Sequence, residues 1–303
     1  MTPHLWLLSP RFRDRLLLTL LMTLTIPTMT HAQSTSDHPQ SSAHLPEFVA
    51  HRGASWLAPE NTLASIQLAW QLHADGVEVD IYRTKDGKLA LFHDRTTERT
   101  GGRDRAVIDQ TLAELQELEV GSWKAEQWRG ERVISLDEAI SFVPTGKRMF
   151  IEIKTGTDTV EPMLEAFDRS GLFPHQLVVI AFEYEVAAKT KQLRPRTPVY
   201  WLSSFRQDAE TGEWSPSMDE LVGRAVEAGL DGLNLQFAGP ATQASEVQKI
   251  RDSGLGYYIW TVNDPEAAEL AIELGVDGIT TDRPAWLRKQ LLHRNGWKLM
   301  PKP

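Results

Sequence analysis

The feature that most restricts the fold of this chain is a regular exchange, from residue 47 onward, between short apolar runs and helix-length amphipathic segments. The apolar runs have the length of strands, and the segments between them carry apolar residues three and four positions apart, as helices do. The candidate strands occupy residues 47–51, 76–83, 88–93, 148–154, 177–182, 198–203, 232–236, 256–262 and 277–281. Helix-length segments include 61–74, 159–170, 184–193, 217–228, 242–253 and 265–274. This alternation indicates a parallel sheet built from βαβ units.

The number of strands narrows the fold class further. Lys85-Asp86-Gly87 predicts a hairpin turn between 76–83 and 88–93, which leaves eight main strands. Eight strands in about 250 residues predict an α/β fold, the TIM (β/α)8 barrel. A doubly wound open sheet is the alternative, but no Gly-x-Gly-x-x-Gly follows the first strand to support a dinucleotide site. The span 95–135 breaks the rhythm and is expected to be a small insertion after the second strand that helps to build the active-site mouth.

The first residues of the chain have the pattern of an export signal. Three arginines at 11, 13 and 15 precede the apolar run 16–26, and Thr30-His31-Ala32 offers a small-residue cleavage site. The run is shorter than the roughly 20 apolar residues of a membrane span, so no stable span is expected, although an uncleaved anchor is an alternative. The predicted organisation is a signal peptide (1–32), a flexible Ser-rich leader (33–45), a barrel domain (46–295) and a tail (296–303). The predicted location is the periplasm or the outside of the cell.

Composition excludes several classes of function. The 303 residues carry a formal net charge of -9, which argues against a general nucleic-acid binder. The chain has no cysteine, so disulfides, thiolate zinc sites and cysteine nucleophiles are excluded, and any metal must be held by oxygen or imidazole ligands. A metalloprotease is disfavoured because no His-Glu-x-x-His occurs.

The stretch GVEVDIYRT (76–84) alternates apolar and polar residues, so Glu78 and Asp80 share one face of a strand. Taken alone, it could be a half-exposed edge strand. In a barrel, however, functional residues gather at the C-terminal ends of the strands. The same end is predicted to hold His51, Arg52, His93, Asp94, Glu152, Lys154 and Trp260.

These residues suit the cleavage of a phosphodiester. Three carboxylates form an oxygen cage for one hard divalent cation, Ca²⁺ or Mg²⁺: Glu78, Asp80 and Glu152. Arg52 and Lys154 offer positive donors to a phosphate, and His51 and His93 can serve as acid and base near neutral pH. Trp260, of a residue type that more often belongs to a core, is placed with the substrate-binding group.

Five segments together resemble the glycerophosphodiester phosphodiesterase family, over roughly residues 47–290. They are HRGASWLAPENTLAS (51–65), GVEVDIYRTKDGKLALFHD (76–94), FIEIK (150–154), WTVN (260–263) and GVDGITTDRP (275–284). The resemblance implies the same barrel, cation ligands, acid–base histidines and phosphate contacts. It also implies that Glu60 ligates the metal or orients His51 or Arg52, while Asn61 is expected to cap the first helix. Ala181 stands where the family often has serine, and we expect it to remove a hydroxyl from the mouth.

The implied reaction converts a small glycerophosphodiester into sn-glycerol 3-phosphate and an alcohol through a cyclic phosphate. A lysophospholipase D, or a lyase that stops at the cyclic phosphate, is the alternative. An apolar mouth would favour it, and six aromatic residues could form one: Trp56, Trp123, Trp128, Trp201, Phe205 and Trp214. A non-catalytic phosphate-binding module would be expected to lack a histidine or an acid of the set, and none is missing. Head group, identity of the cation and oligomeric state are left open by the sequence.

Overall fold

The computed structural model describes residues 45–295. The predicted signal peptide, the leader up to residue 44 and the tail 296–303 lie outside the described residues, as does the proposed cleavage site.

Eight parallel strands close into a barrel. In the order of their hydrogen bonding they are β1 (Glu47–Ala50), β2 (Gly76–Arg83), β4 (Arg148–Ile153), β5 (Leu177–Ala181), β6 (Val199–Ser203), β9 (Gly232–Gln236), β10 (Gly256–Trp260) and β11 (Gly278–Thr281). The ring closes because β1 pairs with β11 on one side and with β2 on the other. The predicted TIM barrel is confirmed, and the doubly wound alternative is wrong.

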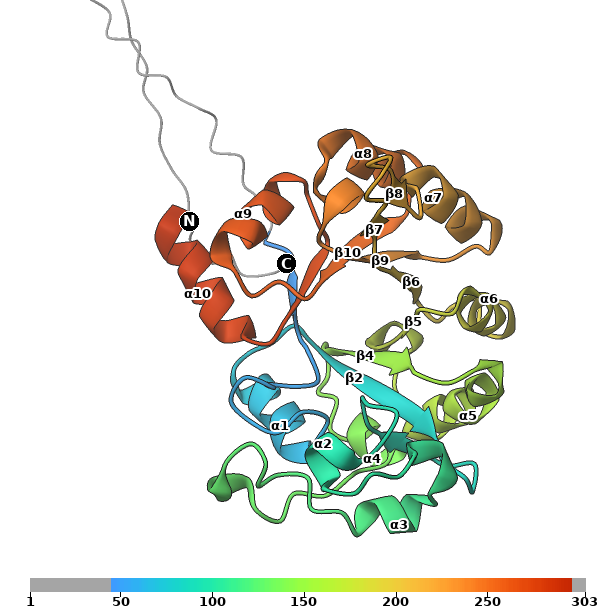
Figure 1. Cartoon of the computed structure of the whole chain (residues 1–303), viewed down its shortest axis with the longest axis vertical. Helices are drawn as coiled ribbons and strands as arrows, with labels where there is room; N and C mark the ends of the chain where they lie inside the picture. Colours follow the sequence, from blue (N-terminus) through green and yellow to red (C-terminus); the bar gives the residue numbers. More distant parts are fainter. Residues whose placement is uncertain (1–44, 296–303) are drawn as a thin grey trace, which may run out of the picture. The chain divides into compact units, whose positions relative to one another are not determined.

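Helices cover the outside of the strands (Figure 1). They are α1 (Leu63–Gln71), α5 (Val160–Ser170), α6 (Tyr184–Leu193), α7 (Met218–Glu227), α8 (Ala244–Asp252), α9 (Pro265–Glu273) and α10 (Pro284–Asn295). Short 3-10 turns are η3 (Thr157–Thr159), η4 (Pro174–Gln176) and η5 (Gly239–Thr242). Side-chain oxygens begin several helices as local sequence predicts: Ser217 accepts from the backbone of Glu220, and Asp264 accepts from that of Ala267. Helix α10 was not among the predicted segments.

The chain between β2 and β4 forms the predicted insertion, which is compact. Strand β3 (Leu89–Leu91) returns antiparallel to the end of β2. It is followed by α2 (Glu98–Gly101), η1 (Val107–Asp109), α3 (Leu112–Gln116), η2 (Glu126–Trp128) and α4 (Leu136–Ile140). This segment has its own small core, formed by Tyr82, Ala90, Phe92, Val107, Leu115, Leu118, Val120 and Val133. The insertion therefore packs against the end of β2 through this shared core.

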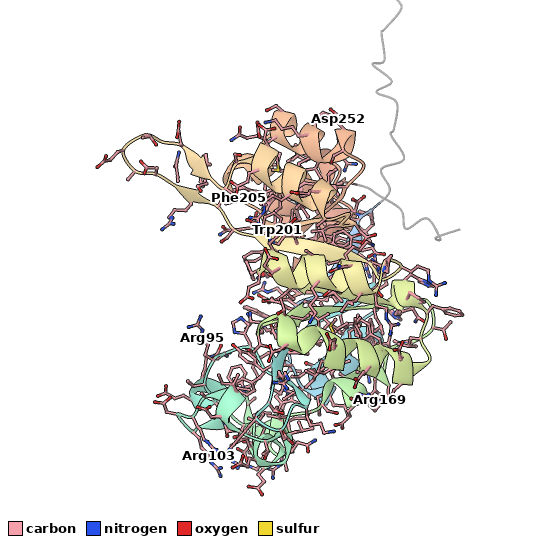
Figure 2. All side chains as sticks on the ribbon, turned by 90° about the vertical axis from the view of Figure 1, so that its right-hand side faces the viewer. Arg95, Arg103, Arg169, Trp201, Phe205 and Asp252 are labelled. Carbon is pink, nitrogen blue, oxygen red and sulfur yellow. The ribbon has the colours of Figure 1, made fainter. Side chains whose placement is uncertain are left out.

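A second unexpected element is the hairpin of β7 (Arg206–Gln207) and β8 (Trp214–Ser215), which follows β6. Figure 2 shows it projecting from the barrel on the same side as Arg95 of the insertion. Trp201 and Phe205, which lie just before it, are only 7% and 9% exposed and belong to the core, so they do not line an apolar mouth. Trp56 and Trp123 are exposed.

The period of two along the strands decides where the acids lie. Val77, Val79 and Ile81 face outward into the layer between strands and helices. The opposite face points into the barrel, whose interior is filled by Val49, Phe150, Val178, Ile180, Tyr200, Leu202 and Tyr258. Glu78 and Asp80 follow on this inward face and are only 2% and 1% exposed, so the edge-strand interpretation is wrong.

Candidate active site

Three carboxylates meet at the C-terminal end of the barrel. Asp80 of β2 and Glu152 of β4 are direct register partners, and Glu78 precedes Asp80 on the same face. One oxygen from each of the three lies within 4.8 Å of the others. Glu78 Oε2 accepts a hydrogen bond from the backbone nitrogen of Arg52 at 2.8 Å, but Oε1 is buried without a hydrogen-bond partner in the described part of the chain. A buried unpaired oxygen in an all-oxygen donor set fits a hard divalent cation.

The titration of these acids follows from their burial. Burial, reinforced by the charges of Asp80 and Glu152, raises the pKa of Glu78 well above its usual value. Burial and the charge of Asp80 raise the pKa of Glu152 to about 7. Burial acts on Asp80 in the same direction, but Arg52 and Lys154 outweigh it, so the pKa of Asp80 is lowered. Without a cation, the cluster therefore favours a bound proton near neutral pH.

Arg52 reaches this cluster through an unusual backbone. Its φ is 55°, in the left-handed region, and that of Gly53 is 81°. A Cβ at Gly53 would lie 2.6 Å from the carbonyl carbon of Ser65 and 2.7 Å from its Cβ, so only glycine fits. Arg52 Nη1 donates to Glu60 Oε1 at 3.0 Å, and Nε lies 3.4 Å from Asp80 Oδ2. The His-Arg-Gly sequence thus turns the arginine toward the acids.

Lys154 lies on the other side of the same acids. Its Nζ donates to Glu152 Oε1 at 2.7 Å and lies 3.5 Å from Asp80 Oδ1. The structure therefore places the two basic side chains that were predicted to bind phosphate, Arg52 and Lys154, next to the three predicted metal ligands. The phosphate contact itself stays a prediction.

Each histidine is oriented by an aspartate through Nδ1. His51 Nδ1 lies 2.7 Å from Asp282 Oδ1, and Asp282 Oδ2 accepts from Asn263 Nδ2 at 2.6 Å. Burial acts to raise the pKa of Asp282, but the hydrogen bond from His51 helps to hold this pKa down, at about 2, so Asp282 is a carboxylate. A carboxylate at Nδ1 leaves Nε2 for proton transfer.

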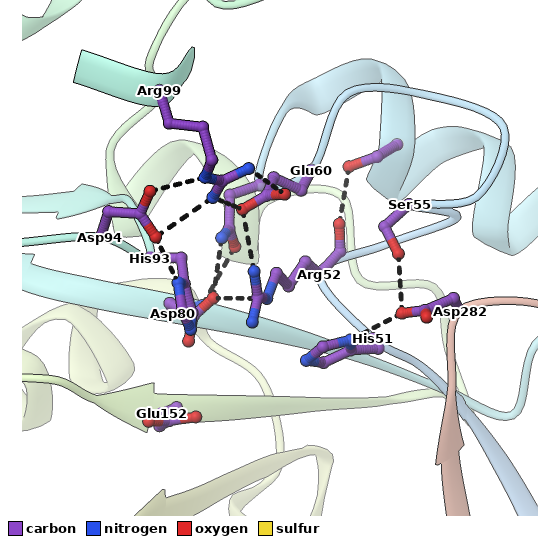
Figure 3. Close-up of polar contacts among 12 residues, drawn as sticks. His51, Arg52, Ser55, Glu60, Asp80, His93, Asp94, Arg99, Glu152 and Asp282 are labelled. Atoms are coloured by element: carbon purple, nitrogen blue, oxygen red, sulfur yellow. Dashed lines mark hydrogen bonds and ion pairs between the residues drawn. The ribbon is translucent and has the colours of Figure 1, made fainter. Parts of the chain in front are cut away.

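The second histidine repeats this arrangement. His93 Nδ1 lies 2.7 Å from Asp94 Oδ1. Burial lowers the pKa of His93, which favours a neutral imidazole. A hydrogen bond from Arg99 lowers the pKa of Asp94 to about 2. Figure 3 draws the two histidines on opposite sides of Arg52, with Asp80 beside His93.

Glu60 and Asn61 were predicted to support the site, and the structure shows what each of them contacts. Glu60 contacts Arg52 and Arg99, so the structure places it beside Arg52, as one of its predicted alternatives required. The expectation that Asn61 caps the first helix is wrong, because Thr62 is the N-cap of α1. Asn61, with φ of 56°, instead donates from Nδ2 to Asp80 Oδ2 at 2.8 Å and accepts from the Asp80 backbone at 3.0 Å. Asparagine tolerates this backbone, and the approach of β2 supplies its partners.

Two aromatic side chains, Trp260 and Phe182, lie against each other at the C-terminal end of the barrel strands. Trp260, at the end of β10, is half-buried, donates from Nε1 to the Asn234 carbonyl at 3.1 Å, and meets the ring of Phe182 edge-on at 5.5 Å. Phe182 itself is exposed. Ala181 is fully buried in the layer between strands and helices, so the expectation that it removes a hydroxyl from the mouth is wrong. Its side chain follows the outward period of β5.

Sequence reasoning did not assign two residues that support the histidines, Asp282, which contacts His51, and Arg99, which contacts the Asp94 partner of His93. Asp282 follows β11 directly, and the rule that functional residues end the strands could have found it. Arg99 lies in the insertion, where no periodic pattern singles out a residue. The described residues also include no helix with the length and apolar character to cross a bilayer.

Comparison with known proteins agrees with this arrangement. The profile of the "Glycerophosphoryl diester phosphodiesterase family" matches residues 51–286. A glycerophosphodiester phosphodiesterase of Bacillus subtilis is 31% identical over 258 residues, 80% of this chain and 85% of the relative. The chain belongs to the glycerophosphoryl diester phosphodiesterase family.

Two further matches cover a similar share of the chain. A glycerophosphodiester phosphodiesterase of Caldanaerobacter subterraneus is 29% identical over 255 residues, 79% of this chain and 95% of the relative. An Oleispira antarctica phosphodiesterase, solved in complex with the product sn-glycerol-3-phosphate, superposes with a TM-score of 0.72 at 28% identity. That match covers 81% of this chain and 96% of the other. The protein is an enzyme of this family, a phosphoric diester hydrolase of the glycerophosphodiester phosphodiesterase type.

Proposed function

We propose that the enzyme hydrolyses glycerophosphodiesters to sn-glycerol 3-phosphate and an alcohol, with His51 and His93 as its acid–base pair. The observation that carries this proposal is that two aspartate-oriented histidines accompany a buried carboxylate triad with an unpaired oxygen. The product bound to the Oleispira antarctica relative supports the same outcome.

One divalent cation, Ca²⁺ or Mg²⁺, would be held by Glu78, Asp80 and Glu152. When bound, it supplies positive charge next to the phosphate and compensates the repulsion among the three acids. The acids would then compete less for Arg52 and Lys154, whose donors would become available to the non-bridging oxygens of the phosphate.

The chemistry divides into two proton-balanced steps. In the first, Nε2 of one histidine takes the proton of the glycerol 2-hydroxyl as that oxygen attacks phosphorus. Nε2 of the other histidine gives a proton to the departing alcohol oxygen, and a cyclic phosphate remains. In the second, water attacks the cyclic phosphate with the roles reversed, so that both histidines regain their starting states. Asp282 and Asp94 stabilise whichever imidazole is protonated.

The lysophospholipase D or lyase alternative draws support from the exposed Trp56, Trp123 and Phe182 in loops at this end of the barrel. We also propose export to the periplasm or medium, for which the arginines, the apolar run and the small-residue site of residues 1–32 provide the support.

The deciding experiment uses metal-stripped enzyme, resupplied with Ca²⁺ or Mg²⁺ and assayed on glycerophosphocholine, glycerophosphoethanolamine and a lysophospholipid. Phosphorus NMR of the product is expected to show glycerol 3-phosphate from the first two substrates, only after a cation is returned. A persistent cyclic phosphate would support a lyase instead, and full activity in the stripped enzyme would contradict the role of the cation.

A further inference from the structure

A single guanidinium in the insertion joins two carboxylates of the active site. Arg99 of α2 donates from Nε to Asp94 Oδ2 at 2.6 Å and from Nη2 to Asp94 Oδ1 at 3.2 Å. Toward Glu60 it donates from Nη1 to Oε2 at 3.0 Å and from Nη2 to Oε1 at 2.6 Å. Every nitrogen of the fork is therefore engaged (Figure 3).

Each of these two carboxylates contacts a different residue of the proposed catalytic site. Asp94 orients His93 through Nδ1 at 2.7 Å, and Glu60 accepts from Arg52 Nη1 at 3.0 Å. Arg52 belongs to the loop after β1, and His93 follows β3. Arg99 thus lies at the centre of a continuous chain of ionic hydrogen bonds that links two active-site segments remote in sequence.

We propose that Arg99 is a positioning residue, which fixes the imidazole of His93 and the guanidinium of Arg52 in one geometry by bridging Asp94 and Glu60. This inference rests on the proposed role of His93. Its physical basis is the rigid, planar fork of arginine, which can bind two carboxylates at once, whereas an ammonium is a point charge on a flexible stem.

The position of Arg99 is itself held by the insertion. Its guanidinium lies 5.5 Å from the ring of Trp123. Two other side chains of the insertion donate hydrogen bonds to the loop after β1. Lys124 Nζ donates to the Ser55 carbonyl at 2.7 Å, and Trp128 Nε1 donates to the Leu57 carbonyl at 3.2 Å. Although the Arg99 side chain is 42% exposed, its hydrogen bonds to Asp94 and Glu60 therefore join two anchored segments.

The test compares Arg99→Ala and Arg99→Lys with a matched control, Arg105→Ala. Arg105 is on the same insertion, is 44% exposed and pairs with Glu114 at 3.0 Å, away from Asp94 and Glu60. With the full chain and saturating cation, we expect Arg99→Ala to lower kcat about 10–100-fold, as loss of an outer partner of an active-site group typically does. KM should change less than kcat, because Arg52 keeps its direct contacts with Glu60 and Asp80 and loses only the support of Arg99 behind Glu60. Arg99→Lys should recover part of kcat, and Arg105→Ala should match the wild type.

A double-mutant cycle separates positioning from general stabilisation. Because Arg99 acts on His93 through Asp94, adding Arg99→Ala to Asp94→Asn should lower kcat far less than Arg99→Ala does alone. Thermal unfolding of every variant reports whether the fold is kept, and Arg99→Lys serves if Arg99→Ala does not fold.

The outcomes are distinguishable from those of the proposed function. If His93→Ala keeps its activity, the acid–base proposal fails first. If His93→Ala is inactive but Arg99→Ala has the kcat of Arg105→Ala, the positioning role is overturned. Wild-type kcat in Arg99→Lys, or full additivity with Asp94→Asn, also overturns it.

Discussion

Replacing Glu78 by glutamine should stabilise the metal-free protein and weaken its affinity for the divalent cation. The ligand oxygens of Glu78, Asp80 and Glu152 lie within 4.8 Å of one another. At 4.8 Å and an effective dielectric constant of about 20, two ionised carboxylates repel by about 3.5 kcal/mol. Glu78 escapes part of this by retaining a proton, since its pKa is raised by burial and by its two acidic neighbours. We therefore expect Glu78→Gln to stabilise the metal-free protein by about 1–3 kcal/mol, or about 2–4 °C in Tm per kcal/mol.

The same substitution should lower the affinity for the divalent cation, and with it the stabilisation that the cation gives. A cation at 100 times its Kd stabilises the wild type by about 2.7 kcal/mol, and a 100-fold loss of affinity reduces that gain to about 0.4 kcal/mol. The glutamine oxygen can still accept the hydrogen bond from the Arg52 backbone, so the local fold should be kept. Only the charge and one ligand oxygen are lost.

The assay is thermal unfolding at pH 7.5, first with a chelator and then across a series of Ca²⁺ or Mg²⁺ concentrations. Glu60→Gln is the matched control, because Glu60 contacts Arg52 and Arg99 and not the triad, so it should keep the full cation-induced rise in Tm. A lowered Tm in chelator together with an undiminished cation-induced rise in Glu78→Gln would refute the reasoning.

Four further outcomes are expected. His51→Ala and His93→Ala should each nearly abolish turnover without lowering Tm, and near-normal turnover in either would remove it from the acid–base pair. Asp282→Asn should lower kcat at least about tenfold, because it disturbs the proton at His51 Nδ1, and an unchanged kcat would contradict this. Burial and Asp80 raise the pKa of Glu152 to about 7, so the folded metal-free protein binds a proton that the unfolded chain releases above about 4.5. Its stability should therefore fall as pH rises from about 4.5 to about 7, and saturating cation should abolish this fall; a flat profile in chelator would contradict it. Gly53→Ala should destabilise the fold by more than about 1 kcal/mol, the cost of a left-handed residue with a side chain, which chemical denaturation would measure.

Local patterns carried much of the fold. Strands β2 and β9 have the predicted bounds, 76–83 and 232–236, and the other main strands differ from their predicted bounds by one or two residues at one end. Helix α6 also matches its predicted range, 184–193. The hairpin β7–β8 and helix α10 were not predicted, because two-residue strands and a terminal helix of mixed polarity offer little periodic signal.

The candidate site divides in the same way. The predicted metal ligands, the histidines and the two basic side chains all follow from the rule that functional residues of a barrel lie at the C-terminal ends of its strands. The structure brings five of them together: Glu78, Asp80, Glu152, Arg52 and Lys154. Asn61 was misassigned because its sequence context is that of a helix cap, while its actual partner, Asp80, lies on strand β2, which is 19 residues away in sequence.

The sequence by itself determined the barrel, through the periods of two and 3.6, and determined which face of β2 carries two acids. Only the tertiary structure decided what those acids and histidines contact. Asp282 lies 231 residues from His51, and Arg99 lies 39 residues from Glu60. Periodicity specifies which way a side chain faces within its own element, whereas a hydrogen-bond partner depends on the distance between elements, which is set only when the barrel closes and the insertion packs against it.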